Sequence, residues 1–87
     1  MKLKDGFVIR KIAGRDIVLP TGNELNLNHM ISLNESGMFI WKQLREETTA
    51  DTVADALAKH YDISFEDAKS HTLAFIEKLK SYDYLED

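Results

Sequence analysis

The side chains in this sequence that could bind a metal ion are three histidines, and no cysteine accompanies them. His29, His60 and His71 fall in three different predicted elements, and none of the short fixed spacings typical of zinc sites connects them. Without cysteine the chain offers no disulfide, no thiolate nucleophile and no ligand for an iron–sulfur cluster. We therefore expect no metal site, and any redox chemistry would belong to a partner.

The carboxylate side chains are scattered over predicted helix surfaces and are not gathered as an acid–base pair. The sequence also contains no glycine-rich phosphate loop and no nucleophile elbow. These absences predict a protein that is not an enzyme and that holds no cofactor. The remaining function classes are binding and assembly.

Charge is unevenly distributed along the chain. The first 15 residues hold five basic residues against Asp5 alone, whereas six basic and fourteen acidic residues follow. The acidic remainder opposes binding to the phosphates of nucleic acid. No apolar run approaches the roughly 20 residues that a membrane-spanning helix needs, and we expect a cytoplasmic protein.

Strand-like segments occupy the first third of the chain. Residues 7–13 and 16–20 are rich in β-branched and aromatic types, and Gly14-Arg15 between them indicates a hairpin. Residues 25–33 alternate between apolar and polar side chains and predict a third strand. This strand runs into Asn34, a good helix N-cap.

Three amphipathic helices follow, predicted at about 35–45, 50–60 and 65–81. Thr48 or Thr49 would cap the second helix, and Ser64 with Asp67 resembles a capping box at the start of the third. Trp41 is interpreted as a core residue of the first helix and not as a binding platform. We expect one domain over residues 1–87, an α+β fold of winged helix-turn-helix type with three N-terminal antiparallel strands packed on three helices.

Such a fold makes DNA binding an alternative that must be weighed. A recognition helix enters the major groove with its first turn, which here would be Ser64 to Asp67. Glu66 and Asp67 would bring two carboxylates toward the phosphates with no arginine or lysine to compensate. A winged-helix regulator therefore remains the less favoured alternative.

Several short motifs, in this order and spacing, resemble the PqqD family. They are Leu33-Asn34 after a strand, Ile40-Trp41 in the next helix, Thr52-Val53 to Leu57, Tyr61, Phe75-Ile76-Glu77-Lys78-Leu79, and Tyr84-Leu85. The resemblance covers most of the chain, although Asp83 stands where the family commonly has glycine. It implies a non-catalytic recognition element that holds the leader of a ribosomally made precursor peptide and presents the peptide to a modifying enzyme, often a radical SAM enzyme.

The resemblance also implies where the leader would bind. The leader would add as a strand to the edge of the third strand and place apolar side chains in a groove between that strand and the third helix. Here the strand edge would be Asn28, His29, Met30, Ile31 and Ser32, and the opposite wall would be Lys69, Thr72, Leu73 and Ile76. Leu73 lies off the main apolar seam of its helix, which is one reason to place it in this groove.

Three alternatives stay open at this stage. The strand edge could be covered by the domain's own C-terminus or by a second copy in a homodimer, as exposed edges often are. The chain could instead be a purely structural subunit of an enzyme complex. If the recognition function holds, the basic residues Lys11 and Arg15 of the N-terminal sheet are candidates for contact with the modifying enzyme.

Overall fold

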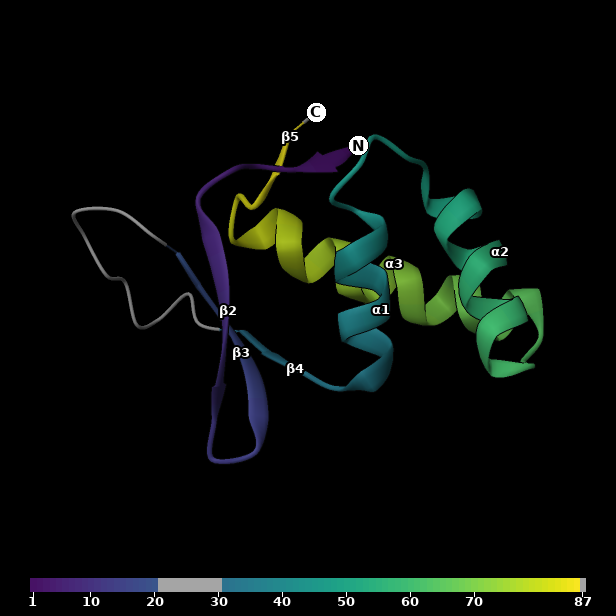
Figure 1. Ribbon diagram of the computed structural model, residues 1–87. Helices are drawn as coiled ribbons and strands as arrows, with labels where there is room; N and C mark the ends of the chain where they lie inside the picture. Colours follow the sequence, from purple (N-terminus) through teal and green to yellow (C-terminus); the bar gives the residue numbers. More distant parts are fainter. Residues whose placement is uncertain (21–30, 87) are drawn as a thin grey trace.

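The computed structural model describes residues 1–20 and 31–86. Its elements in chain order are β1 (Lys2–Leu3), β2 (Phe7–Ile12), β3 (Arg15–Pro20), β4 (Ile31–Leu33), α1 (Glu35–Gln43), α2 (Ala50–Tyr61), α3 (Phe65–Ser81) and β5 (Leu85–Glu86). The strands β2, β3 and β4 form one antiparallel sheet in that order, followed by the three helices (Figure 1). This arrangement confirms the predicted fold class.

Each helix begins at a polar residue whose side chain accepts a hydrogen bond from the first turn. The Asn34 side-chain oxygen accepts from the Gly37 amide at 2.7 Å, and the Ser64 hydroxyl accepts from the Asp67 amide at 3.1 Å. Of the two threonines considered, Thr49 is the cap of α2. These bonds satisfy amides that would otherwise lack a partner within the helix, so the chemistry of single residues fixes the three helix starts.

The turn between β2 and β3 differs from the prediction by one residue. Ile12 pairs with Arg15, so the two turn residues are Ala13 and Gly14, at φ 52° and 80°. Positive φ at both positions suits the right-handed twist of a two-residue hairpin. Strand β2 therefore ends at Ile12, one residue earlier than expected.

The predicted third strand is described only in its last part. Residues 25–30 of that prediction lie outside the described residues, and β4 itself covers Ile31–Leu33. The first helix ends at Gln43, two residues before the expected position, because Leu44 already has the backbone geometry of a C-cap. Helix α2 continues to Tyr61 and ends where Asp62 adopts a left-handed conformation.

A two-stranded sheet that the sequence did not predict joins the two ends of the described chain. Leu3 in β1 pairs with Leu85 in β5, and both side chains are buried. Further backbone bonds run from Leu3 to Leu44 and from Lys4 to Tyr84, at 2.8 and 2.9 Å. The N-terminus is thereby tied to both the end of α1 and the C-terminal segment.

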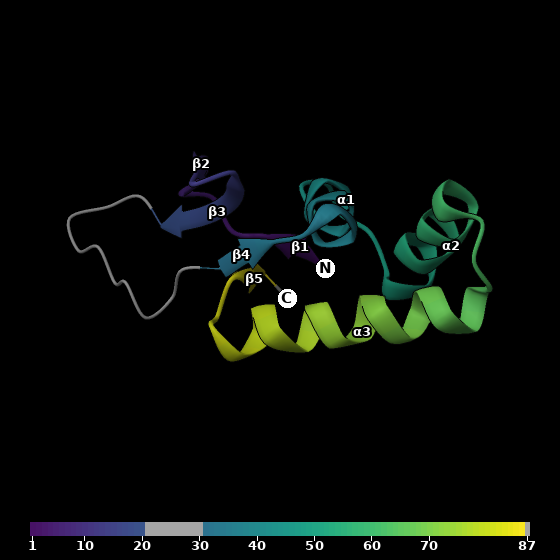
Figure 2. The same ribbon diagram turned by 90° about the horizontal axis from the view of Figure 1, so that it is seen from below.

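The hydrophobic core lies between the sheet and the helices. In Figure 2, α3 runs along one side of the molecule, with β4 and α1 above it. Trp41 is 3% exposed and meets the ring of Phe7 edge to face, with 5.7 Å between ring centroids. The prediction that Trp41 is a core residue is confirmed.

Asp83 allows a test of the left-handed turn after α3. This residue has φ 60°, and its carboxylate pairs with the Lys4 ammonium at 3.0 Å on the surface. Asp83→Gly and Asp83→Ala both remove the ion pair, but only alanine keeps the Cβ clash of the left-handed conformation. We expect the glycine variant to be about 1–2 kcal/mol more stable than the alanine variant in urea unfolding. Equal urea midpoints for the two variants would mean that the turn accommodates the alanine side chain without strain.

Candidate functional site

The structure places the four predicted α3 residues on different sides of that helix. Thr72 and Ile76 are 0% and 1% exposed and belong to the core, so their side chains cannot form a surface wall. The Lys69 ammonium lies 3.0 Å from the carboxylate of Asp51 in α2. Leu73 is exposed. The four residues therefore do not form one continuous exposed surface, and their contact with a leader stays a prediction.

The side of α3 that borders the described part of β4 carries a different set of residues. Phe75 and Lys78 line a pocket together with Ser32 and Leu33. Lys69 precedes Lys78 by nine residues, about two and a half helical turns, and so lies on the opposite side of the helix. The residues of α3 that border surface pockets near α1 and β4 are His71, Ala74, Phe75 and Lys78, which we call the helix row.

Strand β4 supplies the second border of the candidate site. Within the described residues β4 pairs on one side only, with β3, through Leu33–Asp16, Ser32–Ile17 and Ile31–Val18. Ile31 and Leu33 point into the core, and Ser32 is exposed. Of the predicted strand-edge residues, Ile31 thus contributes backbone but no accessible side chain. Asn28, His29 and Met30 lie outside the described residues.

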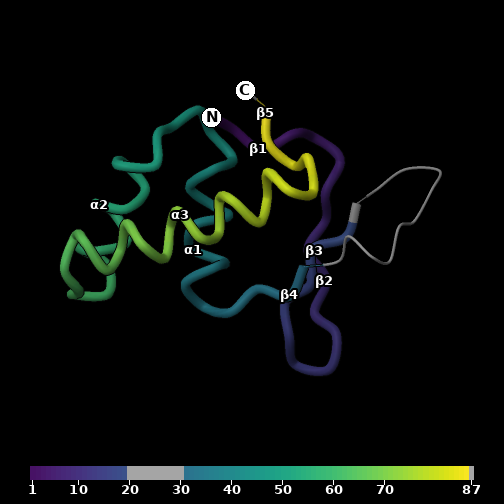
Figure 3. Tube along the Cα trace, turned by 180° about the vertical axis from the view of Figure 1, so that it is seen from behind, coloured from purple at the N-terminus to yellow at the C-terminus, as the bar shows by residue number. Residues whose placement is uncertain are grey.

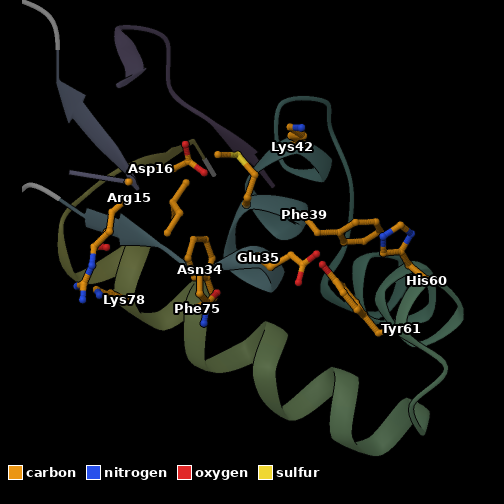
Figure 4. Close-up of a pocket in the computed structure, with 14 residues that line it drawn as sticks. Arg15, Asp16, Asn34, Glu35, Phe39, Lys42, His60, Tyr61, Phe75 and Lys78 are labelled. Atoms are coloured by element: carbon orange, nitrogen blue, oxygen red, sulfur yellow. The ribbon is translucent and has the colours of Figure 1, made fainter. Parts of the chain in front are cut away.

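A main pocket of about 860 Å³ opens where β4 joins α1 (Figure 4). One face of α1 forms its floor through Glu35, Met38, Phe39 and Lys42, which are spaced at helical intervals. The start of β3, the end of α2, and Phe75 and Lys78 of α3 form its sides. A side pocket of about 240 Å³ lies on the other face of α1 and shares Asn34, Phe75 and Lys78 with the main pocket.

Phe75 stands between the two pockets because a glycine faces it. A Cβ built on Gly37 would lie 3.3 Å from the Phe75 ring, 3.0 Å from the Asn34 side-chain oxygen and 3.6 Å from Leu33. The absence of a side chain at Gly37 therefore lets the ring lie against the first turn of α1. Phe75 is half-buried and borders both pockets.

Three aromatic rings, those of Phe39, His60 and Tyr61, form the end of the main pocket beside α2 (Figure 4). His60 stacks on Phe39 with 4.7 Å between centroids, and Tyr61 meets both rings edge-on at 4.7 and 6.0 Å. Burial raises the pKa of the Tyr61 phenol, and the negative charge of Glu35 raises it further. The phenol is therefore neutral near pH 7 and can donate a hydrogen bond.

Five charged side chains surround the main pocket. Arg15, Lys42 and Lys78 are cationic and Asp16 and Glu35 are anionic, and none of them forms an ion pair with a described residue. The positive charges are in excess, although the whole chain is acidic. The pocket therefore suits an apolar ligand that also carries negative charge.

The described residues include no group of three or more histidine, cysteine or acidic side chains that could hold a metal ion. His60 is engaged with Phe39, His71 borders the side pocket, and His29 lies outside the described ranges. Among the helices that the structure describes, none has the length and apolar character required to cross a membrane.

Comparison with known proteins gives two matches. The family model for coenzyme PQQ synthesis protein D (PqqD) matches residues 13–85. Among solved structures, TbiB1 in complex with the TbiA(beta) leader peptide is similar, with a TM-score of 0.74 and 22% sequence identity, over 99% of this chain and 95% of that one. At this sequence identity the structural match shows similarity of the fold alone. No curated protein matches the chain significantly.

Proposed function

Because the chain belongs to the PqqD family, we propose that it binds the leader of a ribosomally synthesised precursor peptide and presents that peptide to a modifying enzyme, such as a radical SAM enzyme. The domain itself, residues 1–87, would perform no catalysis. Chemistry on the core peptide would belong to the modifying enzyme, consistent with a chain that contains no cysteine.

This proposal rests mainly on the edge of β4. That edge has no partner among the described residues, and it lies beside the main and side pockets. An added peptide strand gains affinity from backbone hydrogen bonds to such an edge and selectivity from pockets that take alternate side chains. Here β4 offers the edge, and the main and side pockets flank it through Leu33, Asn34 and Phe75. The similar structure, TbiB1, was solved with a leader peptide bound.

DNA binding is not favoured over this function. The first turn of α3 exposes Glu66 and Asp67, and the next basic residue along the chain, Lys69, is already paired with Asp51. A role as a purely structural subunit has no specific feature in its favour, because it gives no use to the pockets beside β4.

An NMR titration tests the proposed function directly. The labelled protein would receive short peptides matching the leaders of precursors encoded beside its gene. We expect amide shifts at residues 31–33, in the first turn of α1 and along the helix row. The exposed outer side of α2, around Asp55 and Lys59, should change little and serves as the internal reference.

The salt dependence of the same titration separates peptide from DNA recognition. A strand-in-groove complex with apolar anchors should lose little affinity between 50 and 200 mM salt, whereas a DNA complex loses affinity steeply. If no neighbouring leader shifts the spectrum and a DNA duplex does, the proposed function fails in favour of a regulator.

A further inference from the structure

The β2–β3 hairpin has two faces of different character. Phe7 and Ile9 of β2 and Val18 of β3 point to one face and belong to the core or pack on it. The pairing register places the alternate residues on the other, outer face. These outer residues are Val8, Arg10, Ile12, Arg15, Ile17 and Leu19.

The outer face is apolar and basic at once. Val8, Ile17 and Leu19 are only half-buried and belong neither to the core nor to the residues packed on it. Ile12 is 47% exposed, the largest exposure among the large hydrophobic residues that the structure describes. Arg10 and Arg15 lie among these aliphatic side chains, opposite Ile17 and Ile12 in the register. Arginine is enriched at protein interfaces, and exposed apolar area beside it adds surface that a partner can bury.

The hairpin also presents this face away from the helices. Figures 1 and 3 show the β2–β3 turn extending from the body of the molecule. Residues 10–15 are exposed, and the tight left-handed turn at Ala13 and Gly14 fixes the relation of the two strands. The face meets the main pocket at Arg15, and its remaining residues, which line neither the main nor the side pocket, are open to a partner.

We propose that the outer face of the β2–β3 hairpin is the docking surface for the modifying enzyme, through an apolar patch on that enzyme bordered by acidic residues. The proposal rests on the proposed function, since only a recognition element that delivers a peptide needs this second contact. Arg10 shares the outer face with Arg15, whereas Lys11 pairs opposite Asp16 on the inner side. The proposal therefore uses Arg10 with Arg15, whereas the pair expected from the sequence, Lys11 and Arg15, lies on two different faces.

Charge favours an enzyme over a second copy of this chain. In a two-fold symmetric dimer through this face, Arg10 and Arg15 of one protomer would lie against the same residues of the other, which is repulsive. Contact between this face and the acidic helices of another copy is the competing arrangement, and the sedimentation measurement below tests it. An acidic surface on a different protein avoids the repulsion between like charges.

The test variant is Arg10→Glu with Ile12→Ser, which changes the outer face and no residue that lines the main or side pocket. Arg15 stays unchanged because it borders the main pocket. The matched control is Lys80→Glu with Ile63→Ser, the same chemical changes at exposed sites on α3 and at the α2–α3 turn. Isothermal titration measures the affinity of each protein for the leader and for the modifying enzyme encoded beside the gene.

We expect the test variant to bind this enzyme about tenfold or more weakly, with leader affinity within about twofold of the unmodified protein and the control unchanged for both. Unchanged enzyme affinity in a variant with a native amide spectrum overturns the docking surface. The docking surface is also overturned if the native protein binds the leader but not the enzyme. It is overturned as well if sedimentation shows that the native protein is a dimer and that the test variant is not. Should the native protein bind no leader, the proposed function itself fails.

If the amide spectrum shows that the test variant is not folded, the docking surface is tested on the native protein instead. The labelled native chain would be titrated with the unlabelled enzyme, and line broadening centred on residues 8–19 supports the surface. Broadening centred on the helices instead overturns it.

Discussion

Replacing Phe75 with alanine should weaken leader binding by roughly 10- to 100-fold while the domain remains folded. The ring borders both the main and the side pocket, so it is the side chain best placed to contact apolar leader residues on either side of α1. Burying one aromatic side chain contributes about 1.5–3 kcal/mol, which corresponds to this loss in affinity. Fluorescence anisotropy with a labelled leader peptide measures the effect.

Loss of the Phe75 ring also costs stability, but less than a core truncation would. The ring is half-buried and lies against Gly37, whereas fully buried phenylalanines cost about 3–5 kcal/mol when truncated. We expect Phe75→Ala to lower the free energy of unfolding by about 2 kcal/mol, as measured by urea unfolding. The variant then stays folded, and its leader affinity can be compared with that of the unmodified protein.

Leu73→Ala is the matched control for Phe75→Ala. Leu73 is 41% exposed on the same helix and lines neither the main nor the side pocket. Its truncation should change both leader affinity and stability little. If Leu73→Ala weakens binding and Phe75→Ala does not, the leader lies on the other side of α3, as the sequence alone had indicated.

Local chemistry explains why the helices were predictable. Asn34, Thr49 and Ser64 each accept a hydrogen bond from an amide of the first turn, and these interactions involve residues only three positions apart. Residue type and position in the first helix then indicated that Trp41 is buried. Both signals lie within short stretches of sequence, so no tertiary information was needed.

The side of α3 that faces β4 could not be predicted in the same way. Spacing identifies the buried seam but does not say which neighbour lies on each flank of it. The flank with Lys69 faces α2, as the ion pair with Asp51 indicates, and the flank with Lys78 faces the main pocket. The half-buried position of Phe75 depends on Gly37, a residue 38 positions earlier that supplies room by lacking a side chain.

The pairing of β1 with β5 was missed for a related reason. Each strand has two residues, too few to display the alternation by which strands are recognised. Their pairing joins Leu3 to Leu85 across almost the whole chain, and no local signal specifies such a contact.

Trp41→Ala should have the largest effect on stability of any substitution considered for this protein. The side chain is 3% exposed and contacts Phe7 edge to face, and Phe7 in turn lies 4.3 Å from Tyr84 between ring centroids. Truncating a buried tryptophan costs about 3–5 kcal/mol. Small domains are stable by only about 5–15 kcal/mol, so much of the total would be lost.

The same variant separates a structural role of Trp41 from a binding role. It lines neither the main nor the side pocket, so any loss of leader affinity should follow the unfolded fraction and disappear under conditions that restore folding, such as lower temperature or added sucrose. Circular dichroism and leader titration on the same sample measure both quantities. Ile63→Ala, at a 37% exposed position, should lose little stability by comparison. Weak leader binding by a fully folded Trp41→Ala protein would place Trp41 in the binding site and contradict its assignment to the core alone.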